Sequence, residues 1–231
     1  MSREKYFFDP NKLPAGEKAY YEKIRPIIEG LLNDLKKNCC LRRAEFEETK
    51  NFIILMKDKD EIGMAFNRIV ELFSSSQKIS KFMEQNRDYF TDQDFSYLFM
   101  SQLYFLSLVH IEMFKNFLLF YLKRGSKQKF KDKMTLGPFL LKLKKVSPVY
   151  GQLIENELDI GLRNSFAHGL FHIEVKPGTE PIFIYYDDLG KLRNPISIPI
   201  AELMKKRKNY NIIYLTLASL IAEKMEEKTF R

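Results

Sequence analysis

Cysteine, glycine and proline are all scarce in this 231-residue chain. The two cysteines, Cys39 and Cys40, are neighbours and cannot link distant segments. This excludes a disulfide framework and favours a reduced, cytoplasmic setting. Glycine (10 residues) and proline (9 residues) both fall below average usage. So few turn-forming residues argue against an all-β sandwich or barrel.

Long apolar runs are also missing. The longest, residues 117–122 (FLLFYL), is far shorter than the roughly 20 residues that a membrane-spanning helix needs. The first 12 residues contain charges and no continuous apolar stretch. We therefore expect no membrane association and no secretory signal. Hydrophobic residues make up 45% of the chain and charged residues 29%, which excludes a wholly disordered protein.

Positive charge is concentrated in one segment, residues 123–145, which contains nine basic residues and one acidic residue. This segment carries the whole formal charge of +8, so the rest of the chain is balanced. A positive patch on a neutral body is typical of a polyanion-binding protein, although a solvated lysine-rich loop has the same composition. The basic residues are Lys123, Arg124, Lys127, Lys129, Lys131, Lys133, Lys142, Lys144 and Lys145.

The spacing of apolar residues predicts a mainly α protein. The predicted helices span residues 11–38, 44–57, 60–75, 77–88, 91–124, 136–145, 150–168 and 200–228. The helix that starts at Thr91 or Asp92 is apolar on nearly all faces and should be the central, buried helix. Alternating apolar segments predict a small β-hairpin at about 171–187, with a further short strand at 196–198.

Residues 162–169 (LRNSFAHG) place a guanidinium, a carboxamide and an imidazole near one helix end. Asn164 and His168 are four residues apart and share a helix face, and the long side chain of Arg163 extends toward the same region. An arginine clamps a phosphate and stabilises its charge, and a histidine exchanges protons with the attacking or leaving oxygen. The motif therefore suits phosphodiester chemistry. From spacing alone, surface residues or helix caps remain the alternative.

The string LRNSFAHG resembles the Arg-Asn-x-x-x-His signature of the HEPN superfamily (higher eukaryotes and prokaryotes nucleotide-binding). The preceding long helix, with HIEMFKNFLLFYL, is similar to the family helix that carries an acidic residue, here Glu112. The resemblance covers about residues 91–169. It implies a HEPN-type up-and-down helical bundle at 89–231, with residues 1–88 as an N-terminal helical extension.

HEPN proteins usually dimerise, and many are metal-independent endoribonucleases with a composite site at the dimer interface. By this resemblance, Arg163 would stabilise the phosphorane, His168 would act as general acid or base, Asn164 would orient one of them, and Glu112 would position the site. The basic segment 123–145 would bind RNA.

The resemblance further implies a homodimer in toxin–antitoxin or antiviral defence, with an antitoxin or activator protein as a possible partner. No cofactor and no metal are expected. Leu170 occupies the position of the tyrosine found in members that an antitoxin silences by AMP transfer. Two alternatives stay open: a non-catalytic HEPN subunit that binds nucleotide or RNA or acts as a scaffold, and a helical sensor in which the motif occurs by chance.

Overall fold

The computed structural model describes residues 9–39, 75, 78, 79, 81–125, 134–174, 181–186 and 195–226. This part of the chain is mainly α-helical with one small antiparallel sheet, which confirms the predicted mainly α fold class with a β insertion. Among the described helices, none is long and apolar enough to cross a membrane. The predicted helix 44–57 and nearly all of 60–75 lie outside the described residues.

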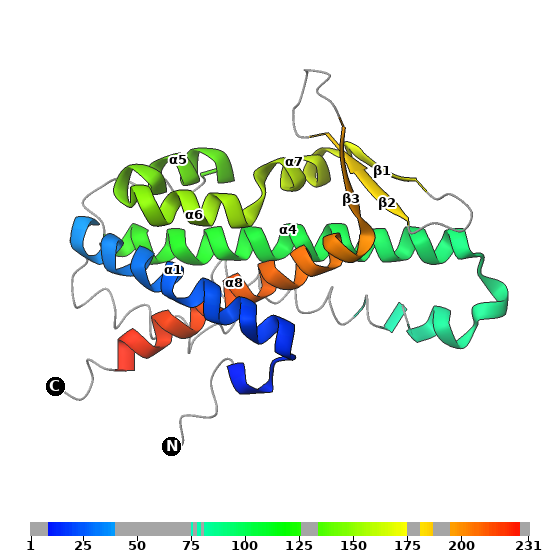
Figure 1. Cartoon of the computed structure of the whole chain (residues 1–231), viewed down its shortest axis with the longest axis horizontal. Helices are drawn as coiled ribbons and strands as arrows, with labels where there is room; N and C mark the ends of the chain where they lie inside the picture. The colour runs from blue at the N-terminus through cyan, green and yellow to red at the C-terminus, as the bar shows by residue number, and fades with distance from the viewer. Residues whose placement is uncertain are drawn as a thin grey trace.

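The central element is α4 (Asp92–Gly125), which runs along most of the molecule (Figure 1). It begins with a reciprocal cap between Thr91 and Asp94. The Thr91 hydroxyl oxygen accepts a hydrogen bond from the Asp94 backbone N–H at 3.2 Å, and the Asp94 carboxylate accepts one from the Thr91 backbone N–H at 2.8 Å. Such a cap satisfies backbone donors at the start of a helix. The predicted helix start at Thr91 or Asp92 is therefore confirmed, with Asp92 as the first helical residue and Thr91 in the cap.

The larger core surrounds the C-terminal half of α4. It contains α1 (Ala15–Cys39), α5 (Leu136–Val146), α6 (Pro148–Leu158) and α8 (Ile200–Glu226). In Figure 1, α5 and α6 lie along one side of α4, and α8 crosses it obliquely. Although α1 precedes the predicted boundary at residue 88, its apolar face is buried in this same core. Residues with no exposed surface include Ile24, Ile28, Phe114, Leu118, Phe139, Leu143, Ile154, Ile213 and Leu217.

A break in the helix preceding the sheet corrects the prediction of one continuous helix over 150–168. The structure has α6 and then a separate helix, α7 (Ile160–His168), with Asp159 between them at φ 45°. The Asp159 carboxylate accepts a hydrogen bond from the Leu162 backbone N–H at 3.1 Å. It also forms an ion pair with Lys206 of α8 at 2.8 Å. Asp159 thus caps α7 and ties its first turn to α8.

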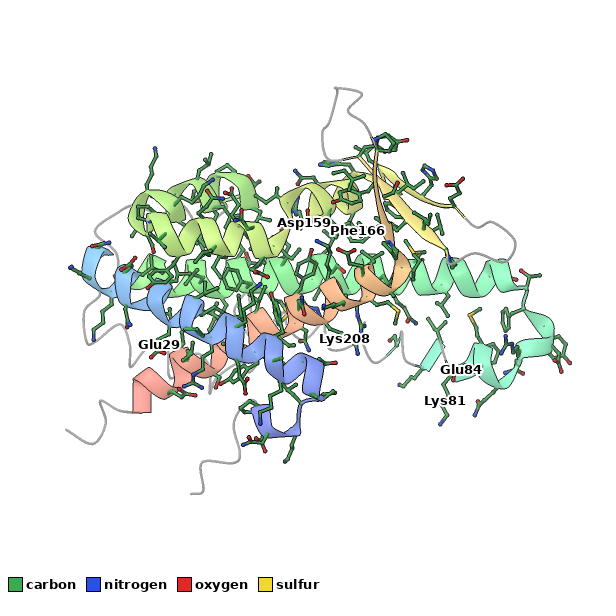
Figure 2. The ribbon with its side chains drawn as sticks, viewed as in Figure 1. Glu29, Lys81, Glu84, Asp159, Phe166 and Lys208 are labelled. Carbon is green, nitrogen blue, oxygen red and sulfur yellow. The ribbon has the colours of Figure 1, made fainter. Side chains whose placement is uncertain are left out.

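The smaller core holds α7 between α4 and the sheet. Strands β1 (Phe171–Glu174), β2 (Ile182–Tyr185) and β3 (Ile196–Pro199) pair antiparallel in the order β1-β2-β3, which confirms the predicted hairpin and third strand. Phe166 of α7 lies against this sheet (Figure 2), with ring centroids 5.5 Å from Phe171 and 5.4 Å from Phe183. The smaller core contains Met100, Leu103, Leu162, Phe166, Phe183, Tyr185, Ile198 and Leu203.

Candidate functional site

The motif residues lie on α7, which ends where the sequence predicts. Gly169 adopts a left-handed conformation at φ 66°, and the Leu170 backbone N–H donates to the Ser165 carbonyl at 2.9 Å. This is the usual geometry of a glycine-terminated helix. His168 is therefore the last residue of α7, and the next histidine in the chain, His172, lies in β1. Among the described residues, no group of three or more metal-binding side chains is present.

Arg163, Asn164 and Glu112 lie together between α7 and α4. Nη2 of Arg163 donates to Oε1 of Glu112 at 2.6 Å, and Nη1 donates to the Asn164 side-chain oxygen at 3.2 Å. The Arg163 side chain is only 21% exposed, and its Nε is buried without a hydrogen-bond partner in the described structure. Three of the four predicted catalytic residues are thus in contact. Arg163 and Glu112 are 51 positions apart in the sequence and lie on different helices.

A fourth side chain of this cluster, Lys115, is absent from the sequence-based set. Its ammonium contacts Oε2 of Glu112, one turn earlier on α4, and its side chain is only 10% exposed. Burial by itself raises the pKa of Glu112, but the hydrogen bonds and charges of Lys115 and Arg163 outweigh burial and lower the pKa below its usual value. Glu112 is therefore ionised at neutral pH, and the cluster carries one net positive charge.

His168 does not join this cluster in a single chain. Its side chain is exposed at the end of α7, with no hydrogen bond or ion pair to any described residue. Five residues along an α-helix correspond to about 500° of rotation, so His168 and Arg163 point in directions about 140° apart. The described contacts therefore anchor the guanidinium on α4 and leave the imidazole facing solvent.

Only part of the predicted basic segment can be located. Lys127, Lys129, Lys131 and Lys133 lie outside the described residues, as do the side chains of Lys123 and Arg124. Within α5, Lys145 is exposed, but Lys144 pairs with Glu155 of α6, which neutralises its charge locally. The proposed role of this segment in RNA binding stays a prediction.

Comparison with protein-family models, with curated proteins and with solved structures finds no match for this chain. Membership of the HEPN superfamily thus stays a prediction from residues 91–169.

Two further buried polar side chains lie on α4 and α8. Nδ1 of His110 and Nε of Arg207 are both buried, and neither has a hydrogen-bond partner in the described part of the chain. Burial, with a further contribution from the Arg207 charge, lowers the pKa of His110 from 6.5 to about 4. His110 is therefore neutral in the folded protein at physiological pH. The influence of Arg207 on His110 could not be predicted, because the two residues are far apart in the sequence.

His110 makes the stability of the fold depend on pH. Because its pKa is about 4 in the folded protein and 6.5 in the unfolded chain, the unfolded chain binds more protons between these values. The free energy of unfolding should therefore fall as the pH drops through this window, by about 3 kcal/mol from this group alone. In urea titrations near neutral pH and near pH 4, His110→Gln should reduce the pH dependence by this amount. The matched variant of exposed His172, His172→Gln, should keep the wild-type slope; equal slopes for all three proteins would contradict the assignment.

Proposed function

We propose that this chain is a metal-independent endoribonuclease of the HEPN type, acting as a homodimer in the cytoplasm, in toxin–antitoxin or antiviral defence. One observation carries the proposal. Arg163 of the Arg-Asn-x-x-x-His motif is a half-buried guanidinium, positioned by Glu112 at 2.6 Å and Asn164 at 3.2 Å. The motif histidine lies at the exposed end of the same helix. A fixed cation and an accessible proton-transfer group are what phosphodiester cleavage requires.

The proposed reaction is an internal transfer within RNA. The 2′-oxygen of one nucleotide attacks the adjacent phosphorus, and the bond from phosphorus to the 5′-oxygen of the next nucleotide breaks. His168 takes the proton from the 2′-hydroxyl or delivers a proton to the leaving 5′-oxygen, and solvent water exchanges the other of these two protons. Arg163 binds the non-bridging oxygens as negative charge builds up on them. The products are a 2′,3′-cyclic phosphate and a free 5′-hydroxyl.

The position of His168 supports the proposed homodimer. Arg163 and His168 project from different sides of α7, and α7 itself is held between α4 and the sheet. A second copy that supplies His168 to the Arg163 of the first would complete the site. This arrangement matches the composite site that the HEPN resemblance implies.

The test is a cleavage assay on end-labelled RNA in the presence of EDTA. Cleavage by the wild-type protein that leaves cyclic-phosphate ends is expected, because no metal takes part in the proposed reaction. Loss of cleavage in EDTA, or ends with a 5′-phosphate, would contradict the mechanism.

A non-catalytic role is the second candidate, and the Glu112–Arg163 ion pair is the observation that favours it. An arginine already paired with a carboxylate inside its own chain can serve packing or dimer contacts alone. RNA or nucleotide binding without turnover, over several RNA sequences, would select this alternative.

A further inference from the structure

Glu112 is shared between two cations. Its Oε1 accepts from Arg163 of α7 at 2.6 Å, and its Oε2 accepts from Lys115 of α4. Each carboxylate oxygen therefore has its own donor. Of the three side chains, Lys115 is the least exposed, at 10%, against 21% for Arg163 and 30% for Glu112. Among the described residues, the Lys115 ammonium has no other partner than Glu112.

The second cation becomes important when Arg163 binds a substrate. A phosphodiester that accepts hydrogen bonds from the guanidinium competes with Glu112 for the same N–H donors. If Glu112 had Arg163 as its sole partner, losing it would leave a partly buried carboxylate without compensation, which is costly. With Lys115 in place, Glu112 keeps one cationic partner after its ion pair with Arg163 is broken. The free-energy cost of breaking that ion pair is therefore lower.

We propose that Lys115 is a positioning residue that retains Glu112 while Arg163 transfers from this carboxylate to a phosphodiester oxygen of the substrate. This inference rests on the proposed ribonuclease function and specifies how its site opens. Lys115 acts through Glu112 and does not itself touch RNA. Its effect should therefore appear in RNA affinity rather than in the rate of the chemical step.

The first test compares Lys115→Met with Lys115→Arg. Binding is measured with an RNA carrying a 2′-O-methyl group at the cleaved position, which cannot react. Lys115→Met should raise the dissociation constant and the KM about tenfold and leave kcat within about twofold, because Glu112 then competes fully for Arg163. Lys115→Arg, which keeps the charge, should restore wild-type values. Lys37→Met, at an exposed position of α1, is the matched control and should bind as wild type does.

The second test repeats the Lys115→Met substitution in a protein that lacks the Glu112 carboxylate. In a Glu112→Gln background, Lys115→Met should change RNA affinity by less than about twofold, since there is no longer a carboxylate to retain. The same tenfold loss in both backgrounds would mean that Lys115 contacts RNA directly, and this would overturn the proposal. If Lys115→Met does not fold, Lys115→Gln replaces it with the same expected result, because glutamine keeps a polar side chain at this position but removes the charge.

Arg163→Ala, measured beside them, separates this inference from the proposed function. If the wild-type protein neither binds nor cleaves RNA, the ribonuclease function itself is wrong. If Arg163→Ala binds and cleaves RNA as the wild type does, the proposed role of Arg163 is wrong. If Arg163→Ala loses activity and Lys115→Met behaves as wild type, the function stands and only the role of Lys115 is overturned.

Discussion

Arg163→Ala is expected to lower RNA cleavage at least about 100-fold, because it removes the cation that stabilises the charge on the phosphorane. The fold should survive the change. Without Arg163, Glu112 still pairs with Lys115, so no buried charge is left without a partner. The measurement is the single-turnover rate on end-labelled RNA, together with thermal unfolding of the same preparations.

The matched control is Arg25→Ala. Arg25 of α1 pairs with Glu223 of α8 at 2.9 Å, at a partly exposed position in a different part of the molecule. Its removal should leave cleavage unchanged, because exposed ion pairs contribute little and Arg25 lies outside the proposed site. Arg163→Lys keeps the charge but loses the forked donor geometry, so we expect intermediate activity. Full activity in a folded Arg163→Ala protein would refute the proposed role of Arg163.

The elements that the sequence predicts well are those set by local patterns. α4 is marked by apolar residues on nearly all of its faces and by Thr91 and Gly125 at its ends. The hairpin is marked by two alternating segments around a turn-rich stretch, and the observed register places Phe183 and Ile198 on one buried face. Capping and alternation are short-range properties, so they can be read from the residues alone.

The break at Asp159 has no such local sign. The apolar residues Ile154, Leu158, Leu162 and Phe166 follow one another at a spacing of four, so the helical pattern runs straight through the break. What stabilises the break is the Asp159 carboxylate, which caps α7 and pairs with Lys206. Because Lys206 is 47 positions away in the sequence, this partner could not be predicted from local sequence patterns.

The residue types of the candidate site could be predicted from the sequence, but not all of its residues. Arg163, Asn164 and Glu112 were expected on residue type and resemblance, and the structure brings them into contact. Lys115 was missed, although its position three residues after Glu112 on a predicted helix was an available signal. The place of His110 in a largely apolar helix was a signal for its burial, but the further lowering of its pKa by Arg207 of a distant helix could not be predicted.

A heterodimer of Arg163→Ala and His168→Ala subunits is expected to regain about half of the wild-type cleavage rate, although each mutant homodimer should be inactive. If each site takes Arg163 from one copy and His168 from the other, this heterodimer has one intact site out of two. Differently tagged subunits are co-expressed, and the heterodimer is purified through both tags. The matched control pairs a wild-type subunit with an Arg163→Ala/His168→Ala double mutant. This heterodimer should be inactive, because each of its sites contains one mutated residue. The reverse result, with the control half-active and the mixed heterodimer inactive, would show that Arg163 and His168 act from the same chain.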